Sequence, residues 1–287
     1  MDYERRYEAY RLAVEDYLNG LFTGSAPYGR LYEAIRYSLL AGGKRIRPVL
    51  TLEFARLGGI DWHLALPYAC ALELVHNYSL IHDDLPCMDD DDLRRGKPTN
   101  HKVYGETMAV LAGDAMQPEA FRLIAQAEGL SAESRIAAVE VLAKAAGADG
   151  MVGGQVLDTV YDIGDAEGLT QLNRLKTGVM ISGAAELGCV AAKMNLGMRS
   201  QALKYADGIG RAFQIRDDML DVIGSSQELG KAVGVDTGKN TFVRLYGIEK
   251  CDELVQSYTQ KAIEQLEVFR DHEELAALAR SLTERMK

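Results

Sequence analysis

The chain has little that would stabilise it covalently or hold it in a membrane. Its 287 residues include only four cysteines, and no two of them form a C-x-x-C pair. This argues against structural zinc and against a disulfide framework, and it favours reduced thiols. No stretch approaches the ~20 consecutive apolar residues that a membrane-spanning helix needs, and the first ten residues lack the apolar core of a signal peptide. We therefore expect a cytoplasmic protein without stable membrane insertion.

Basic residues are outnumbered. The chain has 42 acidic and 32 basic side chains, which gives a net charge of −10. A nucleic-acid-binding protein normally presents a basic face, so we expect no nucleic-acid partner. The acidic residues are also clustered, because six of the ten residues from Asp83 to Asp92 are aspartate. This cluster is the first candidate for a functional site.

The chain has only six prolines, and it shows no run of alternating β-branched residues. Long stretches instead carry apolar residues at helical spacing, with glycines between them. This pattern predicts an all-α fold, a single-domain helical bundle of eight to twelve helices spanning residues 1–287. The clearest helical stretches are 31–40, 67–81, 135–146, 169–190, 201–220 and 253–268.

Two aspartate motifs stand out against this helical background. The first, residues 82–92, follows an apolar helix that Pro86 cannot continue. In the second, residues 217–221, the i, i+4 spacing places Asp217 and Asp221 on one helix face. Such dense negative charge is costly near apolar surface unless a cation neutralises it.

Carboxylate oxygens are ligands for Mg²⁺, which commonly bridges one or two carboxylates to substrate phosphates. If the two clusters face each other, they can hold a diphosphate through shared metal ions, which would make it a leaving group. The alternative is an acidic loop in contact with solvent. Calcium binding of the EF-hand kind is excluded, because the glycine and the closing glutamate are missing.

Basic residues accompany the aspartates. The segment GGKRIRP (42–48) ends in Pro48, which we expect to be the first residue of the next helix. Lys44 and Arg47 would then lie at a helix N-terminus, which favours anions. Arg94 and Arg95 come soon after the first aspartate cluster. A guanidinium group can donate two parallel hydrogen bonds to two oxygens of one phosphate. Considered singly, each basic residue could equally be an ordinary surface charge.

Three further polar positions lie beside apolar helices. Lys176 and Thr177 come just before an apolar stretch, and Gln214 stands three residues before the second aspartate motif. A buried lysine near acidic groups is expected to be paired. His76 lies on the helix leading into the first motif, where it could equally be a core histidine.

Together these segments resemble the trans-isoprenyl diphosphate synthases, in particular the bacterial farnesyl diphosphate synthases, over roughly residues 35–250. The matching segments are GGKRIRP (42–48), LIHDDLPCMDDDDLRRGKPT (80–99), GGQVLD (153–158), KTG (176–178), FQIRDDMLDVIG (213–224), Lys231 and KNT (239–241). The resemblance implies an isoprenoid-synthase bundle around a deep central pocket, and a homodimer. It also implies a prenyltransferase that condenses isopentenyl diphosphate head to tail with dimethylallyl or geranyl diphosphate, with three Mg²⁺ ions.

The resemblance also implies a role for each matching residue. The residues expected to bind the metal are Asp83, Asp84, Asp89, Asp217 and Asp221. The residues expected to bind the allylic diphosphate are Arg94, Lys176 and Lys231. Those expected to bind isopentenyl diphosphate are Lys44, Arg47, His76 and Arg95. Thr177 and Gln214 would line the reaction centre. Apolar helices around the charged entrance would keep water away from the carbocation.

Product length depends on the residues one to two helical turns before Asp83. Ser79 and Tyr78 lie four and five positions earlier, about 6 to 7.5 Å deeper at ~1.5 Å per residue. The bulky Tyr78 would block a growing chain, and the resemblance then implies farnesyl diphosphate, with geranylgeranyl diphosphate as the alternative. Two departures from the family pattern bear on this prediction. Pro118 is expected to kink its helix or to reset the start of that helix, and Arg216 stands where the family commonly has glutamine.

Two other functions remain open from the sequence. A terpene cyclase also uses aspartate-rich helices, but the second aspartate motif and GGKRIRP argue against it. A non-catalytic partner subunit would be expected to have lost acidic residues, and none is missing.

Overall fold

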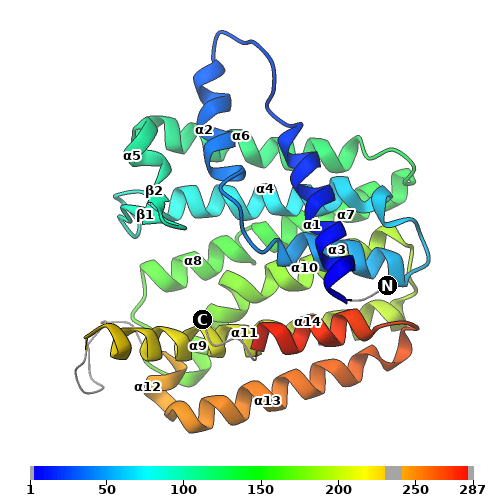
Figure 1. The fold of residues 1–287 in the computed structure, drawn as a ribbon, viewed down its shortest axis with the longest axis vertical. Helices are drawn as coiled ribbons and strands as arrows, with labels where there is room; N and C mark the ends of the chain where they lie inside the picture. Colours follow the sequence, from blue (N-terminus) through cyan, green and yellow to red (C-terminus); the bar gives the residue numbers. More distant parts are fainter. Residues whose placement is uncertain (1–2, 230–240, 284–287) are drawn as a thin grey trace. The chain divides into compact units, whose positions relative to one another are not determined.

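The computed structural model describes residues 3–229 and 241–283, although the side chains of Asp221 and of residues 224–229 lie outside that description. Helices dominate, which confirms the predicted all-α class. The α-helices are α1 (Tyr3–Asn19), α2 (Gly29–Leu39), α3 (Ile46–Leu57), α4 (Leu66–Asp83), α5 (Asn100–Tyr104), α6 (Glu106–Ala125), α7 (Ala132–Ala146), α8 (Met151–Thr159), α9 (Ala166–Asn173), α10 (Val179–Ala191), α11 (Leu196–Leu229), α12 (Phe242–Tyr246), α13 (Ile248–Glu264) and α14 (Glu273–Thr283) (Figure 1).

Three short helical turns and one hairpin complete the described chain. The turns are 3₁₀ at Trp62–Ala65 and Gln265–Val268, and π at Arg174–Gly178. Strands β1 (Leu93–Arg94) and β2 (Lys97–Pro98) pair antiparallel. No helix in the described part of the chain is both long and apolar enough to cross a membrane.

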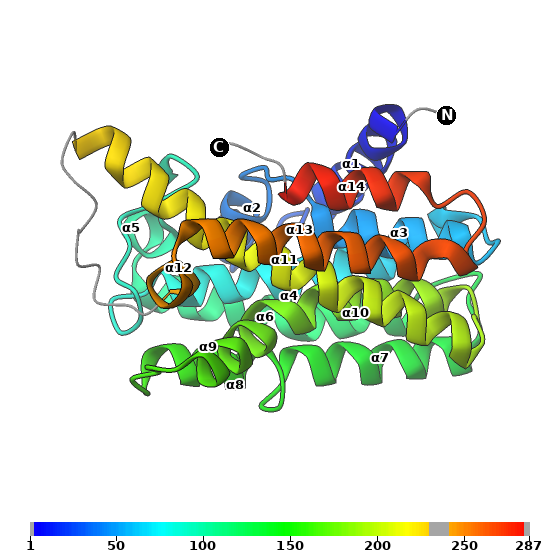
Figure 2. The same cartoon turned by 90° about the horizontal axis from the view of Figure 1, so that it is seen from below.

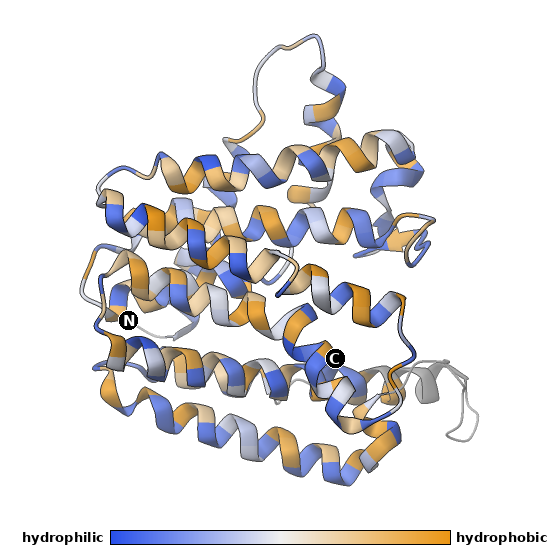
Figure 3. Ribbon diagram, turned by 180° about the vertical axis from the view of Figure 1, so that it is seen from behind, coloured by the Kyte–Doolittle hydropathy of each residue, from blue (hydrophilic) through white to orange (hydrophobic). Residues whose placement is uncertain are grey.

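The chain divides into two compact units. The first unit comprises residues 1–143 and 187–194, and the second comprises residues 144–186 and 195–287. Figure 3 shows that hydrophobic and hydrophilic residues alternate along most helices, as expected where one face packs and the other meets solvent. That the whole chain forms a single domain stays a prediction.

In the first unit, α4 is the central helix. Eleven of its residues are buried, so it is apolar nearly all round, and it packs mainly against α6 and α3. A glycine allows the close approach to α6, because a Cβ at Gly113 would lie 2.1 Å from Nε2 of His82. This packing fixes the end of α4, where the first aspartate motif begins.

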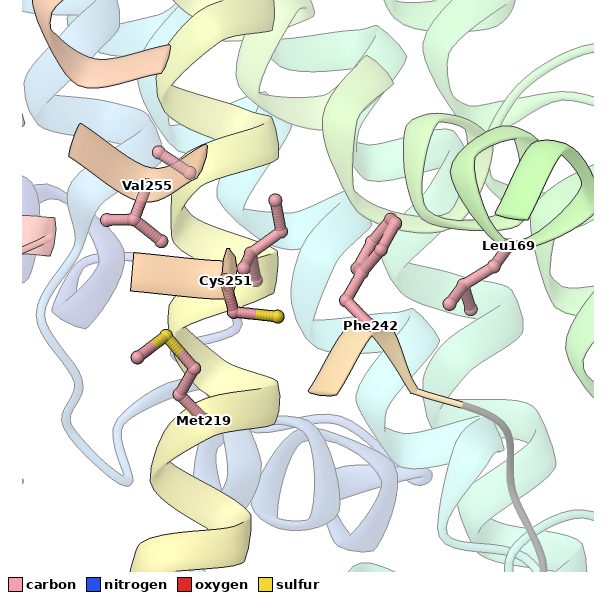
Figure 4. Packing of buried hydrophobic residues seen from close by; sticks show 7 residues of the cluster. Leu169, Met219, Phe242, Cys251 and Val255 are labelled. Atoms are coloured by element: carbon pink, nitrogen blue, oxygen red, sulfur yellow. The ribbon is translucent and has the colours of Figure 1, made fainter. Parts of the chain in front are cut away.

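In the second unit, α11 packs along α13 (Figure 2). The approach again needs a small residue, since a Cβ at Gly208 would lie 2.8 Å from Cβ of Ala262. Around the middle of α11, Met219 packs in a buried cluster with Phe242 and Cys251 (Figure 4). The cluster secures the stretch of α11 that carries the second aspartate motif.

Several local predictions need correction. The helix after GGKRIRP begins at Ile46, so Pro48 is not its first residue. Helix α6 runs from Glu106 through Pro118, so Pro118 does not reset the start of its helix, and the alternative, a kink, stays a prediction. The stretch 169–190, predicted as one helix, is interrupted by the π-turn. Fourteen α-helices within the described residues exceed the eight to twelve predicted, because short helices such as α5 and α12 have too little sequence for a periodic pattern.

Candidate active site

The first aspartate motif folds back on the end of α4. The backbone N–H of Asp89 donates to the carbonyl of Asp83 over 2.9 Å, so the loop brings these two residues next to each other. Asp83 is partly buried at the end of the helix, and Asp89 is exposed. Both were predicted as metal ligands, and the local fold places them together within the first unit.

Asp84 has a different environment from Asp83. Its side chain is 4% exposed, and its Oδ1 accepts hydrogen bonds from Arg94 at 2.7 Å (Nε) and 2.6 Å (Nη2). Burial raises the pKa of Asp84, although the adjacent guanidinium acts in the opposite direction. The structure therefore pairs a predicted metal ligand with a predicted diphosphate ligand. In this state, Arg94 is positioned by the protein's own carboxylate.

The hairpin of β1 and β2 positions the next arginine. Its two turn residues, Arg95 and Gly96, have φ of 53° and 74°, the positive values that a tight two-residue turn of type I′ requires. The Arg95 guanidinium donates to the carbonyl of Gly42, and a Cβ on Gly43 would lie 3.1 Å from its Nη2. The hairpin was not predicted from the sequence, although a glycine between short strand-like residues is a recognised turn signal.

The GGKRIRP segment divides into two kinds of cation. Arg45 is in the left-handed region (φ 51°) with a fully buried side chain. Its guanidinium contacts Glu73 at 2.6 Å and Glu15 at 2.8 Å, so it holds α1, α3 and α4 together. Lys44, by contrast, is exposed.

Arg47 and His76 form the inner part of the same region. Arg47 Nη1 lies 3.4 Å from His76 Nε2, and the Nε atom of Arg47 is buried with no hydrogen-bond partner. Burial, followed by the nearby charges of Arg47 and Arg95, lowers the pKa of His76 well below 6.5. A neutral histidine beside several guanidinium groups leaves their positive charge uncompensated by the imidazole, and an anion would relieve that charge.

The first unit thus brings together all four residues predicted for isopentenyl diphosphate. Lys44 and Arg47 flank the start of α3, His76 lies on α4, and Arg95 comes from the hairpin. Ser79 donates its hydroxyl to the carbonyl of His76, one turn before the aspartate motif.

Tyr78 lies on α4 and is 6% exposed. Its ring meets the ring of His82 edge to face at 5.8 Å between centroids. The aromatic side chain is therefore packed into the first unit, about one helical turn before the aspartate pair Asp83 and Asp84. Its position agrees with the predicted blocking role and equally with ordinary core packing.

In the second unit, the aspartates of α11 also have separate environments. Oδ2 of Asp218 accepts the backbone N–H of Phe242 at 2.9 Å, which fixes the start of α12. Asp217 is partly buried and belongs to the neighbouring face of the helix. Arg216 lies 3.6 Å from Asp252 on α13, so its charge is directed to that helix. The side chain of Asp221 lies outside the description.

The π-turn positions Lys176 and Thr177. Nζ of Lys176 donates to Oδ2 of Asp158 on α8 at 2.6 Å, as expected for a partly buried lysine. Gly154 permits this geometry, because a Cβ there would lie 2.1 Å from the backbone nitrogen of Lys176. π-Turns within helices are often found at functional sites. Asp158 belongs to the GGQVLD segment, and no role for its side chain was predicted from the sequence.

The predicted residues of the second unit are only partly described. Gln214 lies on α11 and is partly buried. Lys231 falls in 230–240, outside the described residues, as do the first two residues of the KNT segment.

Within the described residues, no three His, Cys, Asp or Glu side chains are close enough to hold a metal by themselves. Asp83 and Asp89, whose backbones are joined by a hydrogen bond, nevertheless offer hard oxygen donors for Mg²⁺. Mg²⁺ typically takes one or two carboxylates and completes its shell with water and substrate phosphates. The residues therefore fit a cation that arrives with a diphosphate.

Comparison with known proteins identifies the family. The polyprenyl synthetase family model matches residues 29–281. A chloroplastic geranylgeranyl pyrophosphate synthase of Catharanthus roseus is 47% identical over 256 residues, which cover 87% of this chain and 71% of that protein.

Solved structures show the same similarity. An FPP/GFPP synthase from Zymomonas mobilis has a TM-score of 0.88 at 36% identity and covers 98% of both chains. A geranyltransferase from Legionella pneumophila has a TM-score of 0.89 at 34% identity, covering 99% of this chain and 97% of that one. The fold is therefore of the isoprenoid-synthase type, and the chain belongs to the polyprenyl synthetase family.

Proposed function

We propose that the protein elongates an allylic diphosphate, dimethylallyl or geranyl diphosphate, by head-to-tail addition of isopentenyl diphosphate, and that its product is farnesyl diphosphate. The observation that carries the proposal is the cationic cluster of the first unit, formed by Arg47, His76 and Arg95 near the first aspartate motif. A cluster with that charge suits a diphosphate, and family membership supports the reaction.

Each group of residues then has a task. The isopentenyl diphosphate ligands are Lys44, Arg47, His76 and Arg95. The allylic diphosphate ligands are Arg94, Lys176 and Lys231, with Thr177 and Gln214 at the reaction centre. Departure of the allylic diphosphate leaves a carbocation, which the double bond of isopentenyl diphosphate attacks. A proton is then lost to the departed diphosphate.

The proposed cofactor is Mg²⁺, with three ions expected when diphosphate is bound. The proposed ligands are Asp83, Asp84, Asp89, Asp217 and Asp221. When bound, the metal supplies Lewis-acid charge neutralisation that makes the diphosphate a better leaving group. The Asp84–Arg94 pair must open, or share its carboxylate, for Asp84 to take this role, since Arg94 already occupies Oδ1.

Two observations bear on the length of the product, and they favour different products. The buried ring of Tyr78, one turn before the aspartate pair, favours the shorter farnesyl product. The Catharanthus roseus relative is named as a geranylgeranyl pyrophosphate synthase, which favours the longer alternative. We propose farnesyl diphosphate, because the local obstruction acts directly on the growing chain, whereas overall identity does not.

The test is a set of incubations of the full chain with Mg²⁺, labelled isopentenyl diphosphate and either dimethylallyl or geranyl diphosphate. We expect farnesyl diphosphate from both, identified by chromatography after dephosphorylation. Geranylgeranyl diphosphate would support the alternative product. A cyclised hydrocarbon would indicate a terpene cyclase, and no turnover would indicate a non-catalytic subunit; either result would refute the proposal.

A homodimer and a cytoplasmic location remain predictions. Sedimentation of the purified chain at micromolar concentration is expected to give twice the monomer mass of 31.5 kDa. A monomer at that concentration would refute the predicted assembly.

A further inference from the structure

A cavity of about 250 Å³ lies entirely within the second unit. Its walls come from α9, the π-turn, α11, α12 and α13. Among the described residues with a proposed role in prenyl transfer, only Gln214 lines it. At ~30 Å³ for each water in the liquid, it would hold about eight waters. This is close to the ~300 Å³ at the small end of ligand pockets.

The floor of the cavity is apolar and well packed. Ile215 and Phe242 are 2% and 8% exposed, and Leu254 adds a third apolar side chain. Figure 4 shows Phe242 between Leu169 and Met219 of the cluster below. Such a floor suits the apolar body of a ligand better than it suits ordered water.

The rim of the cavity is basic, although the chain as a whole carries −10. Arg174, Arg211 and Lys250 line it, together with the carboxylate of Asp207. Arg211 is already bonded to Asp207 at 2.8 Å, and Lys250 to Glu253 at 2.7 Å. Arg174 has no hydrogen bond or ion pair within residues 3–229 and 241–283, so its guanidinium is available to a ligand. Basic side chains gathered at a concave site attract anions.

We propose that this cavity is a second small-molecule site, for an anionic head group attached to an apolar body. A carboxylate or a diphosphate on an alkyl or prenyl chain has this chemistry. The head group binds the Arg174 guanidinium at the rim, with Lys250 beside it, and the chain packs on Phe242 and Leu254. This binding requires no prenyl transfer, so it stands apart from the function proposed above.

The test is calorimetric titration of the full chain in EDTA, with decanoate in one arm and geranyl diphosphate in the other. EDTA removes divalent metal, and decanoate lacks the diphosphate that the catalytic residues would recognise. Arg174→Glu reverses the charge at the rim, and Leu254→Trp fills the floor. Lys261→Glu is the matched control, because Lys261 is exposed on α13 and does not line the cavity.

We expect saturable binding of at least one probe, weakened tenfold or more by both Arg174→Glu and Leu254→Trp and changed less than twofold by Lys261→Glu. Binding of decanoate as well as geranyl diphosphate would indicate a general site for anionic amphiphiles, and binding of geranyl diphosphate alone a prenyl diphosphate site. Failure of both probes to bind, or undiminished binding in either cavity variant, would overturn the proposal. The decanoate arm involves neither a diphosphate nor turnover, so its result is independent of the catalytic function.

Discussion

The ring of Tyr78 is a single side chain on which product length is proposed to depend. Replacing it by alanine removes an almost fully buried aromatic group and leaves space below the first aspartate pair. We expect Tyr78→Ala to shift the main product from fifteen to twenty carbons or more, measured by chromatography of the dephosphorylated products. Tyr78→Phe keeps the ring and should keep the farnesyl product. An unchanged product in Tyr78→Ala would remove the proposed role of this side chain.

Arg45 and Lys44 are neighbours with opposite expected effects. Arg45 is fully buried between two glutamates, and breaking a buried ion pair typically costs about 3–5 kcal/mol. We expect Arg45→Ala to lower the free energy of unfolding by that amount in urea denaturation. Lys44→Ala should change stability by about 0.5 kcal/mol or less, but raise KM for isopentenyl diphosphate at least tenfold. The reverse pattern would contradict the assignment of the two side chains.

The neutral His76 predicts a pH effect. Its folded pKa is far below 6.5, so below pH 6.5 the unfolded chain binds a proton that the folded chain does not. Stability contributed by the neutral state is therefore lost as pH falls from 7.5 to 5.5, by about 1 kcal/mol for this one group. His76→Gln should show a shallower decline in denaturation experiments over that range. Equal slopes in the two proteins would contradict the buried, neutral state.

The motif aspartates and arginines could be found from the sequence, because density of like charge beside apolar helices is visible without coordinates. Their individual environments were not predictable. Arg45 and Arg47 are two residues apart in one motif. The left-handed backbone at Arg45 nevertheless directs the Arg45 side chain into the core, which the motif alone does not reveal. The pairing of Asp84 with Arg94 depends on a hairpin whose strands have two residues each, so the sequence marks it by its turn glycine and not by strand periodicity.

At the scale of elements, α8 and the π-turn are joined through one glycine. An added methyl group at Gly154 would lie 2.1 Å from the backbone of Lys176, so the two elements must separate. We expect Gly154→Ala to lower kcat at least tenfold by disturbing the Lys176–Asp158 contact, with about 1–3 kcal/mol of destabilisation.

Gly164→Ala is the matched control for that variant, because a Cβ at Gly164 meets no atom within 4 Å. It should retain wild-type kcat. Wild-type kcat in Gly154→Ala would show that the close approach of α8 is not needed for turnover.

Long helices were predictable from periodicity, and their interruptions were not. The predicted helix at 67–81 appears as α4, and 201–220 lies within α11. The π-turn that interrupts 169–190 was not predictable, because its cause is tertiary, namely the approach of α8 at Gly154. Pro118 lies inside α6, where tertiary packing on α4 outweighs the local preference of proline to begin a helix.

At the scale of the whole molecule, the acidic balance and the all-α class followed from composition and spacing alone. The division into two compact units did not, because no linker or change of composition marks it.

Metal-dependent ionisation of the allylic diphosphate is proposed to require the aspartates of both motifs. The most direct measurement is kcat for farnesyl diphosphate formation with and without Mg²⁺, in the wild type, Asp83→Asn, Asp217→Asn and the exposed-carboxylate control Asp149→Asn. The prediction is a loss of at least 100-fold in each motif variant and in EDTA, with the control unchanged and all folds intact by circular dichroism. Near wild-type turnover in either motif variant, or without divalent metal, would contradict the claim.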